Sequence, residues 1–166
     1  MTVEINHATI RLASVMDVAV VTDIIRNAFQ DVANRFNLTE QNCPKHPSNC
    51  REQWILDAMQ KSVRYYVIDT EGIQRGCVAL EQANAEVCYL ERLAVLPAYR
   101  RCGHGGELVE HALGEAKTLG VQKVDIGIIA ADTELKEWYQ KLGFKVTTKA
   151  AFDHLPFEVI FMSKVI

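Results

Sequence analysis

The sequence LERLAVLPAYRRCGHGGELVEHAL, residues 90–113, combines an apolar strand, a turn at Pro97, a loop rich in arginine and glycine, and the first turns of a helix. A helix that begins near Gly103 leaves its first backbone N–H groups without intrahelical partners, and the positive end of the helix dipole lies there. An anion at this end of the helix is therefore stabilised. We expect the loop to bind a pyrophosphate group.

The residue types in this loop favour the same interpretation. Gly103, Gly105 and Gly106 have no β-carbon, so a ligand can come close to the backbone. Arg100 and Arg101 add positive charge at the mouth of the loop. An ordinary strand-turn-helix connection with small residues for packing is the alternative. A dinucleotide fingerprint and a P-loop are excluded, because the loop lacks the third glycine of the first and the Gly-Lys-Ser/Thr ending of the second.

Two separate blocks of the sequence resemble one protein family. The loop fits the pattern R-x-x-G-x-G, and residues 138–144 read WYQKLGF. The first block resembles the acetyl-CoA loop of the GCN5-related N-acetyltransferases, the GNAT superfamily, and the second resembles the family's lYeklGF segment. The resemblance extends over residues 87–146. It implies an α/β (α+β) fold in a single domain, residues 1–166, with a mixed, mostly antiparallel sheet of six or seven strands, helices on both faces, and a splayed parallel strand pair that holds CoA.

The resemblance also implies where acetyl-CoA, the co-substrate, is bound. The first strand, the loop, a helix over residues 103–119 and a strand over 123–129 form a crossover that makes the two strands parallel neighbours. In the GNAT fold these strands splay apart, and the pantetheine arm bonds to the backbone of the first one. The family's Asn before the second block corresponds to Asp132, which can cap a helix that begins at Thr133. The predicted cofactor-binding residues are Leu93, Ala94, Val95, Arg100, Arg101, Cys102, Gly103, His104, Gly105, Gly106 and Asp132.

Tyr139 is the predicted catalytic acid. On periodicity alone it belongs to an apolar helix stripe with Leu135, Trp138 and Leu142, which indicates a core aromatic residue. The resemblance instead aligns it with the tyrosine that points at the CoA sulfur and protonates the leaving thiolate. A phenol with a pKa of about 10 still holds its proton at neutral pH, and the pKa of a thiol is about 8.5.

Glu91 is the predicted catalytic base. A primary amine with a pKa of about 10.4 is mostly protonated at pH 7, so a carboxylate or a water chain must remove a proton before attack. Glu91 lies on the strand assigned to CoA, and a Glu-Arg pair in an apolar strand is costly to bury unless partners satisfy it, which indicates a cleft. Strand alternation places Glu91 and Leu93 on one face, and Leu90 and Ala94 on the other. The predicted reaction is direct acetyl transfer in a ternary complex, with backbone N–H groups near Leu93 polarising the thioester carbonyl.

Several alternatives stay open. Cys102 offers a covalent acetyl-cysteine route, although no His except the nearby His104 adjoins it, and its place beside the phosphates is far from the thioester. His154, in the connection 149–156, is either a proton acceptor or an ordinary loop histidine. A non-catalytic acyl-CoA binding or sensing module is the rival function, and a transferase for another acyl group, such as succinyl or propionyl, is also compatible.

The rest of the chain reads as alternating strands and helices. Ser14 and Asp17 resemble a capping box ahead of a long amphipathic helix. The predicted strands are His7–Ala13, Arg64–Asp69, Cys77–Glu81, Glu86–Leu96, Lys123–Ile129, Phe144–Thr148 and Phe157–Ser163, and the predicted helices are residues 18–36, one beginning at Asn49 to Glu52, 103–119 and 133–142.

The loop Asn37–Cys50, between the first two helices, contains Cys43, His46 and Cys50. Structural zinc usually takes four ligands in paired short spacings, and the sequence shows no obvious fourth ligand or second Cys pair, so we predict no metal. In GNAT proteins this segment often contributes to substrate specificity. The loop is therefore either a cover on the acceptor side or a surface loop stiffened by its two prolines.

Length and composition fit one globular domain: 166 residues, 49% of them hydrophobic, with a net charge of −3. This charge gives no basic field for nucleic acid. No signal segment is recognised, and no apolar run reaches the roughly 18 residues of a membrane span. Five cysteines without a regular framework indicate a cytoplasmic location. The expected partner is a small-molecule or peptide amine acceptor, whose identity the sequence does not give, and a final strand near the C-terminus leaves a homodimer through that edge open.

Overall fold

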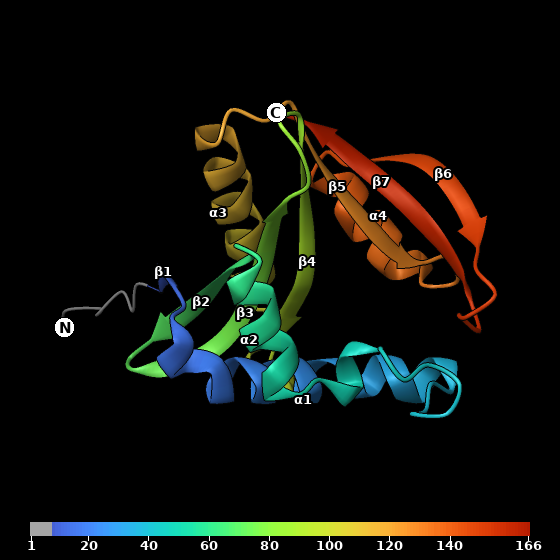
Figure 1. Ribbon diagram of the computed structural model, residues 1–166, viewed down its shortest axis with the longest axis horizontal. Coiled ribbons are helices and arrows are strands. Elements are labelled where there is room, and N and C mark those ends of the chain that lie inside the picture. The colour runs from blue at the N-terminus through green and yellow to red at the C-terminus, as the bar shows by residue number, and fades with distance from the viewer. Residues whose placement is uncertain (1–7) are drawn as a thin grey trace.

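The structure is a computed structural model that describes residues 8–166. Within these residues, seven strands form one sheet in the order β1-β2-β3-β4-β5-β7-β6, and four α-helices pack around it (Figure 1). The strands are β1 (Thr9–Leu12), β2 (Arg64–Thr70), β3 (Ile73–Gln82), β4 (Val87–Val95), β5 (Lys123–Ile129), β6 (Lys145–Ala151) and β7 (Glu158–Val165). The helices are α1 (Val18–Phe36), α2 (Glu52–Gln60), α3 (His104–Thr118) and α4 (Thr133–Lys141), with 3-10 turns η1 (Val15–Asp17), η2 (Pro47–Asn49) and η3 (Pro97–Tyr99). The predicted start of the first strand, His7, lies outside the described residues.

One parallel pair stands in an otherwise antiparallel sheet. Among the described strands, only β4 and β5 run parallel, and their ladder joins residues 87–89 to residues 123–125. Beyond these residues the two strands diverge, and α1 lies across the open end between them (Figure 1). The predicted mixed sheet with a splayed parallel pair is therefore confirmed.

A bulge in β4 changes which of its side chains share a face. Arg92 has a left-handed φ of 53°, and at this point two β4 residues oppose one β3 residue. Leu90 consequently packs into the core beneath α3, whereas Ala94 packs into the core beneath α1. The prediction that Leu90 and Ala94 lie on the same face is wrong, because strict alternation ends at Arg92.

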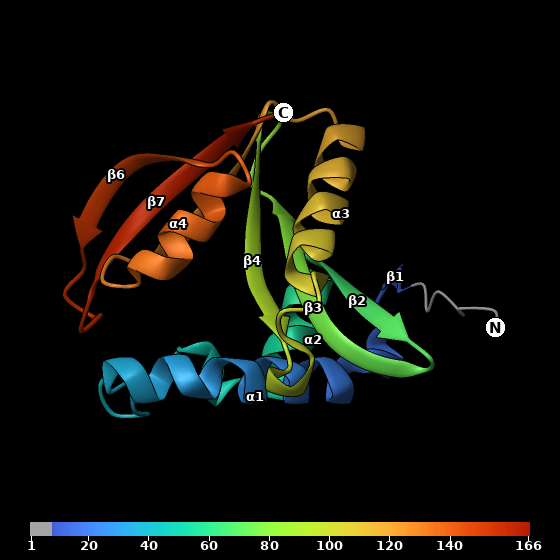
Figure 2. The same cartoon turned by 180° about the vertical axis from the view of Figure 1, so that it is seen from behind.

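Helices cover both faces of the sheet, and each layer encloses its own core. Figure 2, seen from behind, shows α3 and α4 flanking β4, and both helices pack against the same core. The core beneath α3 and α4 includes Leu108, Val109, Val124, Phe144 and Met162. The core beneath α1 and α2 includes Val21, Ile25, Ile55, Val67 and Ala79. A smaller cluster, which includes Ala33, Leu38, Cys43 and Ile129, joins α1 and the following loop to the end of β5.

Local sequence signals explain where several elements begin and end. Glu71 and Gly72 have φ of 55° and 76° and form the two-residue turn between β2 and β3. Gly120, with φ of 81°, follows the end of α3. The Ser14 hydroxyl and the Asp17 carboxylate form the predicted capping box, which starts η1 and thereby leads into α1. The predicted capping box at Ser14 and Asp17 is confirmed.

The last strand of the chain is not at an edge of the sheet. β7 pairs with β5 on one side and with β6 on the other. The expectation that the final strand provides a free edge is therefore wrong, and the edges among the described strands are β1 and β6. Between residues 8 and 166, no helix is both long enough and apolar enough to cross a membrane.

Candidate active site

The loop before α3 presents unpaired backbone amides. Gly103 caps α3 with a φ of 83°, and Arg101 also adopts a left-handed φ, 64°. Among the described residues, no hydrogen-bond partner accepts from the N–H groups of His104, Gly105 and Gly106. These groups lie at the positive end of the helix dipole, so the donor set fits a phosphate group.

Arg100 is held by protein partners. Its Nη1 donates to Oδ2 of Asp31 at 3.0 Å, and its Nη2 donates to the carbonyl of Ala28 at 2.7 Å. Its Nε donates to the carbonyl of Val95 at 3.2 Å. Arg100 therefore ties the loop to α1 and to the end of β4, which leaves the backbone amides as the open donors.

Asp132, which follows β5, is held by protein partners, as Arg100 is after β4. Its Oδ1 accepts from the backbone N–H of Leu135 at 3.3 Å, so the predicted cap of the α4 helix is confirmed. Its Oδ2 accepts from Nη2 of Arg35 at 3.4 Å. Asp31 and Arg35 are one turn apart on α1, so this helix is tied to the loop after β4 and to the segment after β5.

The remaining loop residues differ in their surroundings. Arg101 is exposed, whereas His104 is buried and neither of its ring nitrogens has a hydrogen-bond partner among the described residues. A β-carbon at Gly105 would lie 3.3 Å from the indole of Trp138. The missing side chain at Gly105 therefore makes room for α4, a packing role that the sequence pattern did not distinguish from ligand approach.

Leu93, Ala94 and Val95 lie in the part of β4 that has parted from β5. Leu93 and Val95 pack against the core beneath α3, and Ala94 is buried in the core beneath α1. On the β5 side these three residues have no ladder partner among the described strands. An extended ligand chain can use such an edge for main-chain hydrogen bonds.

Glu91 lies in the part of β4 before the bulge, paired across the ladder with Ala79. Burial, followed by the charge of Glu81 and a hydrogen bond with it, raises the pKa of Glu91 to about 7, and the charge of Arg92 opposes these effects. A carboxyl group with a pKa near neutrality is well suited to accept a proton. Sequence reasoning missed Glu81, although the hairpin at Asn84 and strand alternation would have placed it beside Glu91.

Tyr139 is both a core aromatic residue and a protonated phenol. It is 5% exposed, and its ring packs edge-on against Trp138 and Phe144 at 5.0 and 5.4 Å between centroids. No described residue forms a hydrogen bond with its hydroxyl group. Burial raises the pKa of Tyr139 well above its usual value. The residue therefore keeps its proton throughout the neutral range.

The two alternative reactive residues, Cys102 and His154, are exposed. The sulfur of Cys102 lies 3.6 Å from the carbonyl of Arg100, and the His154 ring lies 5.8 Å from that of Phe152. Neither side chain is bonded to an acid or base among the described residues. An activated nucleophile normally has such a partner.

The candidate metal-ligating side chains of the loop between α1 and α2 are buried. Cys43, His46 and Cys50 are each at most 7% exposed, and Nδ1 of His46 lies 2.8 Å from the Ser48 hydroxyl. Burial, with a smaller effect from the charge of Arg92, lowers the pKa of His46 to about 4, so the imidazole is neutral at pH 7. In the described part of the chain, no group of three or more His, Cys, Asp or Glu residues is arranged to hold a metal.

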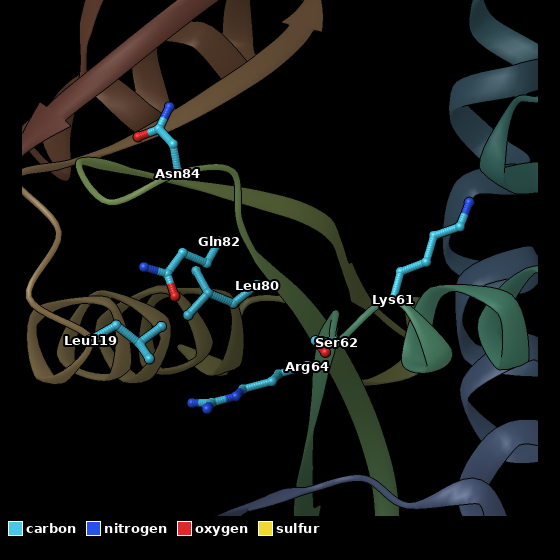
Figure 3. A pocket seen from close by; sticks show the side chains of 7 residues that line it. All are labelled: Lys61, Ser62, Arg64, Leu80, Gln82, Asn84 and Leu119. Carbon is cyan, nitrogen blue, oxygen red and sulfur yellow. The ribbon is translucent and has the colours of Figure 1, made fainter.

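A depression of about 310 Å³ lies elsewhere on the molecule (Figure 3). It adjoins Leu119, which follows the last residue of α3, whereas the candidate phosphate loop precedes the first residue. A helix of this length separates the two by about 20 Å. The depression is therefore not part of the candidate site. Its lining residues are Lys61, Ser62, Arg64, Leu80, Gln82, Asn84 and Leu119.

We expect Gly103→Ala to weaken acetyl-CoA binding measured by calorimetry and to destabilise the protein by about 1–2 kcal/mol in urea unfolding. The reason is that alanine disfavours the left-handed φ of 83° that places the helix amides. Gly114→Ala, at an open position within α3, is the matched control and should stabilise by about 1 kcal/mol with binding unchanged. Equal affinities in the two variants would contradict the assignment of the loop.

Comparisons with known proteins agree with this geometry. A family model described as "Acetyltransferase (GNAT) family" matches residues 26–144. The amino-acid acetyltransferase of Pasteurella multocida (strain Pm70) is 30% identical over 142 residues, which are 85% of this chain and 28% of that protein. The chain spans about a quarter of the length of the curated relatives it matches. PaiA N-acetyltransferase from Thermoplasma acidophilum in complex with coenzyme A aligns with a TM-score of 0.80 at 17% identity, over 96% of this chain and 99% of that one. A GNAT family acetyltransferase from Elizabethkingia anophelis with acetyl-CoA bound aligns with a TM-score of 0.70 at 17% identity, over 96% and 98%.

Proposed function

Because this chain belongs to the acetyltransferase (GNAT) family, we propose that it moves an acetyl group from acetyl-CoA to a primary amine by direct attack in a ternary complex. The single observation that carries the proposal is the splay of β4 from β5. It leaves the backbone of residues 90–95 unpaired on one side, next to a helix whose first amides are also unpaired. An extended ligand with a phosphate at one end matches both features.

The loop and β4 would each bind one part of acetyl-CoA. The amides of His104, Gly105 and Gly106 would hold the pyrophosphate, while Arg100 keeps the loop in place from its contacts with Asp31 and Ala28. The free edge of β4 at Leu93 to Val95 would bond the pantetheine arm. When bound there, acetyl-CoA supplies an activated acetyl group.

Glu91 would remove the proton that keeps the amine from attacking. Its pKa of about 7, raised by burial and by Glu81, lets it accept a proton at neutral pH and release it again. Backbone N–H groups near Leu93 would donate toward the carbonyl oxygen of the transferred group, where negative charge develops.

Tyr139 would protonate the departing sulfur. Its position in α4 is across the splay from β4, and its raised pKa keeps the phenol protonated at working pH.

The alternative of a non-catalytic acyl-CoA binding module is distinguished by turnover. Release of free CoA that depends on an added amine supports the transferase, and binding without any release across a broad amine panel supports the module.

The acceptor is an amine, and an amino acid is the class that the relatives favour. Curated relatives of this chain are named amino-acid acetyltransferases. A peptide amine would also suit a direct-attack mechanism, so the panel should hold free amino acids, simple amines and short peptides. Acetylated product, identified by mass spectrometry, tests the proposal.

The rate should depend on pH with a midpoint near 7. Glu91 acts only when ionised, so kcat/KM should fall about tenfold for each pH unit below 7 and approach a plateau above it. Glu81→Gln removes a neighbouring negative charge and should shift the acid limb to lower pH, which separates Glu91 from titration of the amine itself. An acid limb that stays in place in Glu81→Gln would contradict this assignment.

A further inference from the structure

Arg92 is a guanidinium without an ionic partner beside the candidate base. It forms no ion pair and donates no hydrogen bond among the described residues, and its Nη1 is fully buried. Its guanidinium carbon lies 5.8 Å from the centre of the Trp54 ring in α2, a cation–π contact that offsets only part of the cost of burial. A charge held this way has hydrogen-bonding capacity left for a ligand.

The bulge in β4 explains why Arg92 and Glu91 lie on the same side of the sheet. Glu91 is paired with Ala79, whose side chain belongs to the core beneath α1 and α2. In a regular strand, Arg92 would point to the opposite face. The left-handed φ of 53° instead brings its guanidinium over Trp54, on the α2 side.

Glu91 does not neutralise Arg92. The two side chains form no ion pair in the described part of the chain, and although the charge of Arg92 lowers the pKa of Glu91, burial and Glu81 raise it to about 7. His46, the nearby imidazole of the α1–α2 loop, is neutral, so it does not satisfy the guanidinium either. The face of the sheet beneath this loop therefore holds an uncompensated positive charge next to a proton acceptor.

We propose that Arg92 binds the carboxylate of the acceptor, so that the acceptor is a free α-amino acid whose amine lies at Glu91. This inference rests on the proposed acetyltransferase function. An α-amino acid carries its amine and carboxylate on one carbon, which matches two recognition groups on adjacent residues. A guanidinium is the side chain best matched to a carboxylate, because its N–H groups form two parallel hydrogen bonds. Amines without a neighbouring carboxylate, including peptide N-termini, leave Arg92 unpaired.

The test compares each of the twenty amino acids with its α-amide, which keeps the amine and the side chain but removes the negative charge. Wild-type protein should use the preferred amino acid at least about tenfold better in kcat/KM than its amide. Arg92→Lys should lose most of this preference, chiefly through a higher KM for the acid. Arg51→Lys, at an exposed arginine just before α2, is the matched control and should keep the preference.

The outcomes separate the role of Arg92 from the proposed acetyltransferase function. Amides used as well as acids by the wild-type protein would overturn the role of Arg92 and leave the acetyltransferase proposal standing. No acetylation of any amine, acid or amide by protein that binds acetyl-CoA would overturn both. Urea unfolding shows whether Arg92→Lys is folded, and the comparison of acid with amide in the wild-type protein stands even if the variant does not fold.

Discussion

Glu91→Gln is expected to lower kcat/KM by about a hundredfold to ten-thousandfold at pH 8, since the amide cannot accept the proton of the attacking amine. The same substitution should stabilise the folded protein at that pH. The folded-state pKa of Glu91 is raised to about 7 from its usual 4.5, so ionising it costs folding free energy. This loss of stability grows as pH rises from about 4.5 to 7 and is complete above 7. Glutamine avoids it.

Glu91→Gln should raise the free energy of unfolding by about 1–2 kcal/mol at pH 8, a value that allows for the solvent that still screens the two carboxyl groups. The difference from the wild-type protein should vanish near pH 4. Thermal unfolding at the two pH values measures it. A fall in activity with a rise in stability cannot come from a folding defect. Glu81→Gln is the matched control, because it should also relieve the repulsion but keep the base. Full activity of Glu91→Gln at pH 8 would show that another group, or a water chain, removes the proton.

Tyr139→Phe is expected to lower kcat by about a hundredfold while the affinity for acetyl-CoA is unchanged. Phenylalanine keeps the edge-on contacts with Trp138 and Phe144, so the core beneath α4 is preserved. Only the hydroxyl is lost, and it has no hydrogen-bond partner in the described structure, so stability should not fall. Steady-state kinetics with calorimetric titration of acetyl-CoA separates the two effects.

Tyr89→Phe is the matched control for this prediction. Tyr89 is on β4 and is 41% exposed, so removing its hydroxyl changes neither the core nor the candidate site. Its kcat should equal that of the wild-type protein. If Tyr139→Phe also retains full kcat with its true acceptor, Tyr139 is a core residue alone, as its periodicity in the sequence indicates.

Much of the fold was predictable because its signals are local. The glycines that end α3 and form the β2–β3 turn have left-handed φ values, and the cap residues Ser14 and Asp132 act through neighbours in the sequence. The splayed strand pair followed from the crossover together with the family resemblance. These features depend on backbone geometry that particular residue types favour.

The parts that sequence could not give depend on contacts between distant segments. Arg100 and Asp132 lie in the expected places, but their side chains are bonded to Asp31 and Arg35 on α1, and no periodic pattern reports such pairs. The bulge at Arg92 broke the alternation on which the face assignments of β4 relied. The raised pKa of Glu91 needs Glu81 from the neighbouring strand, so it emerges only once the register is known.

A crystal structure of the protein with CoA tests directly whether the splayed strands bind the co-substrate. The pyrophosphate is expected on the amides of residues 104–106, the pantetheine arm along residues 93–95 of β4, and the sulfur beside Tyr139. CoA bound elsewhere, for example in the depression lined by Lys61 and Arg64, would contradict this expectation.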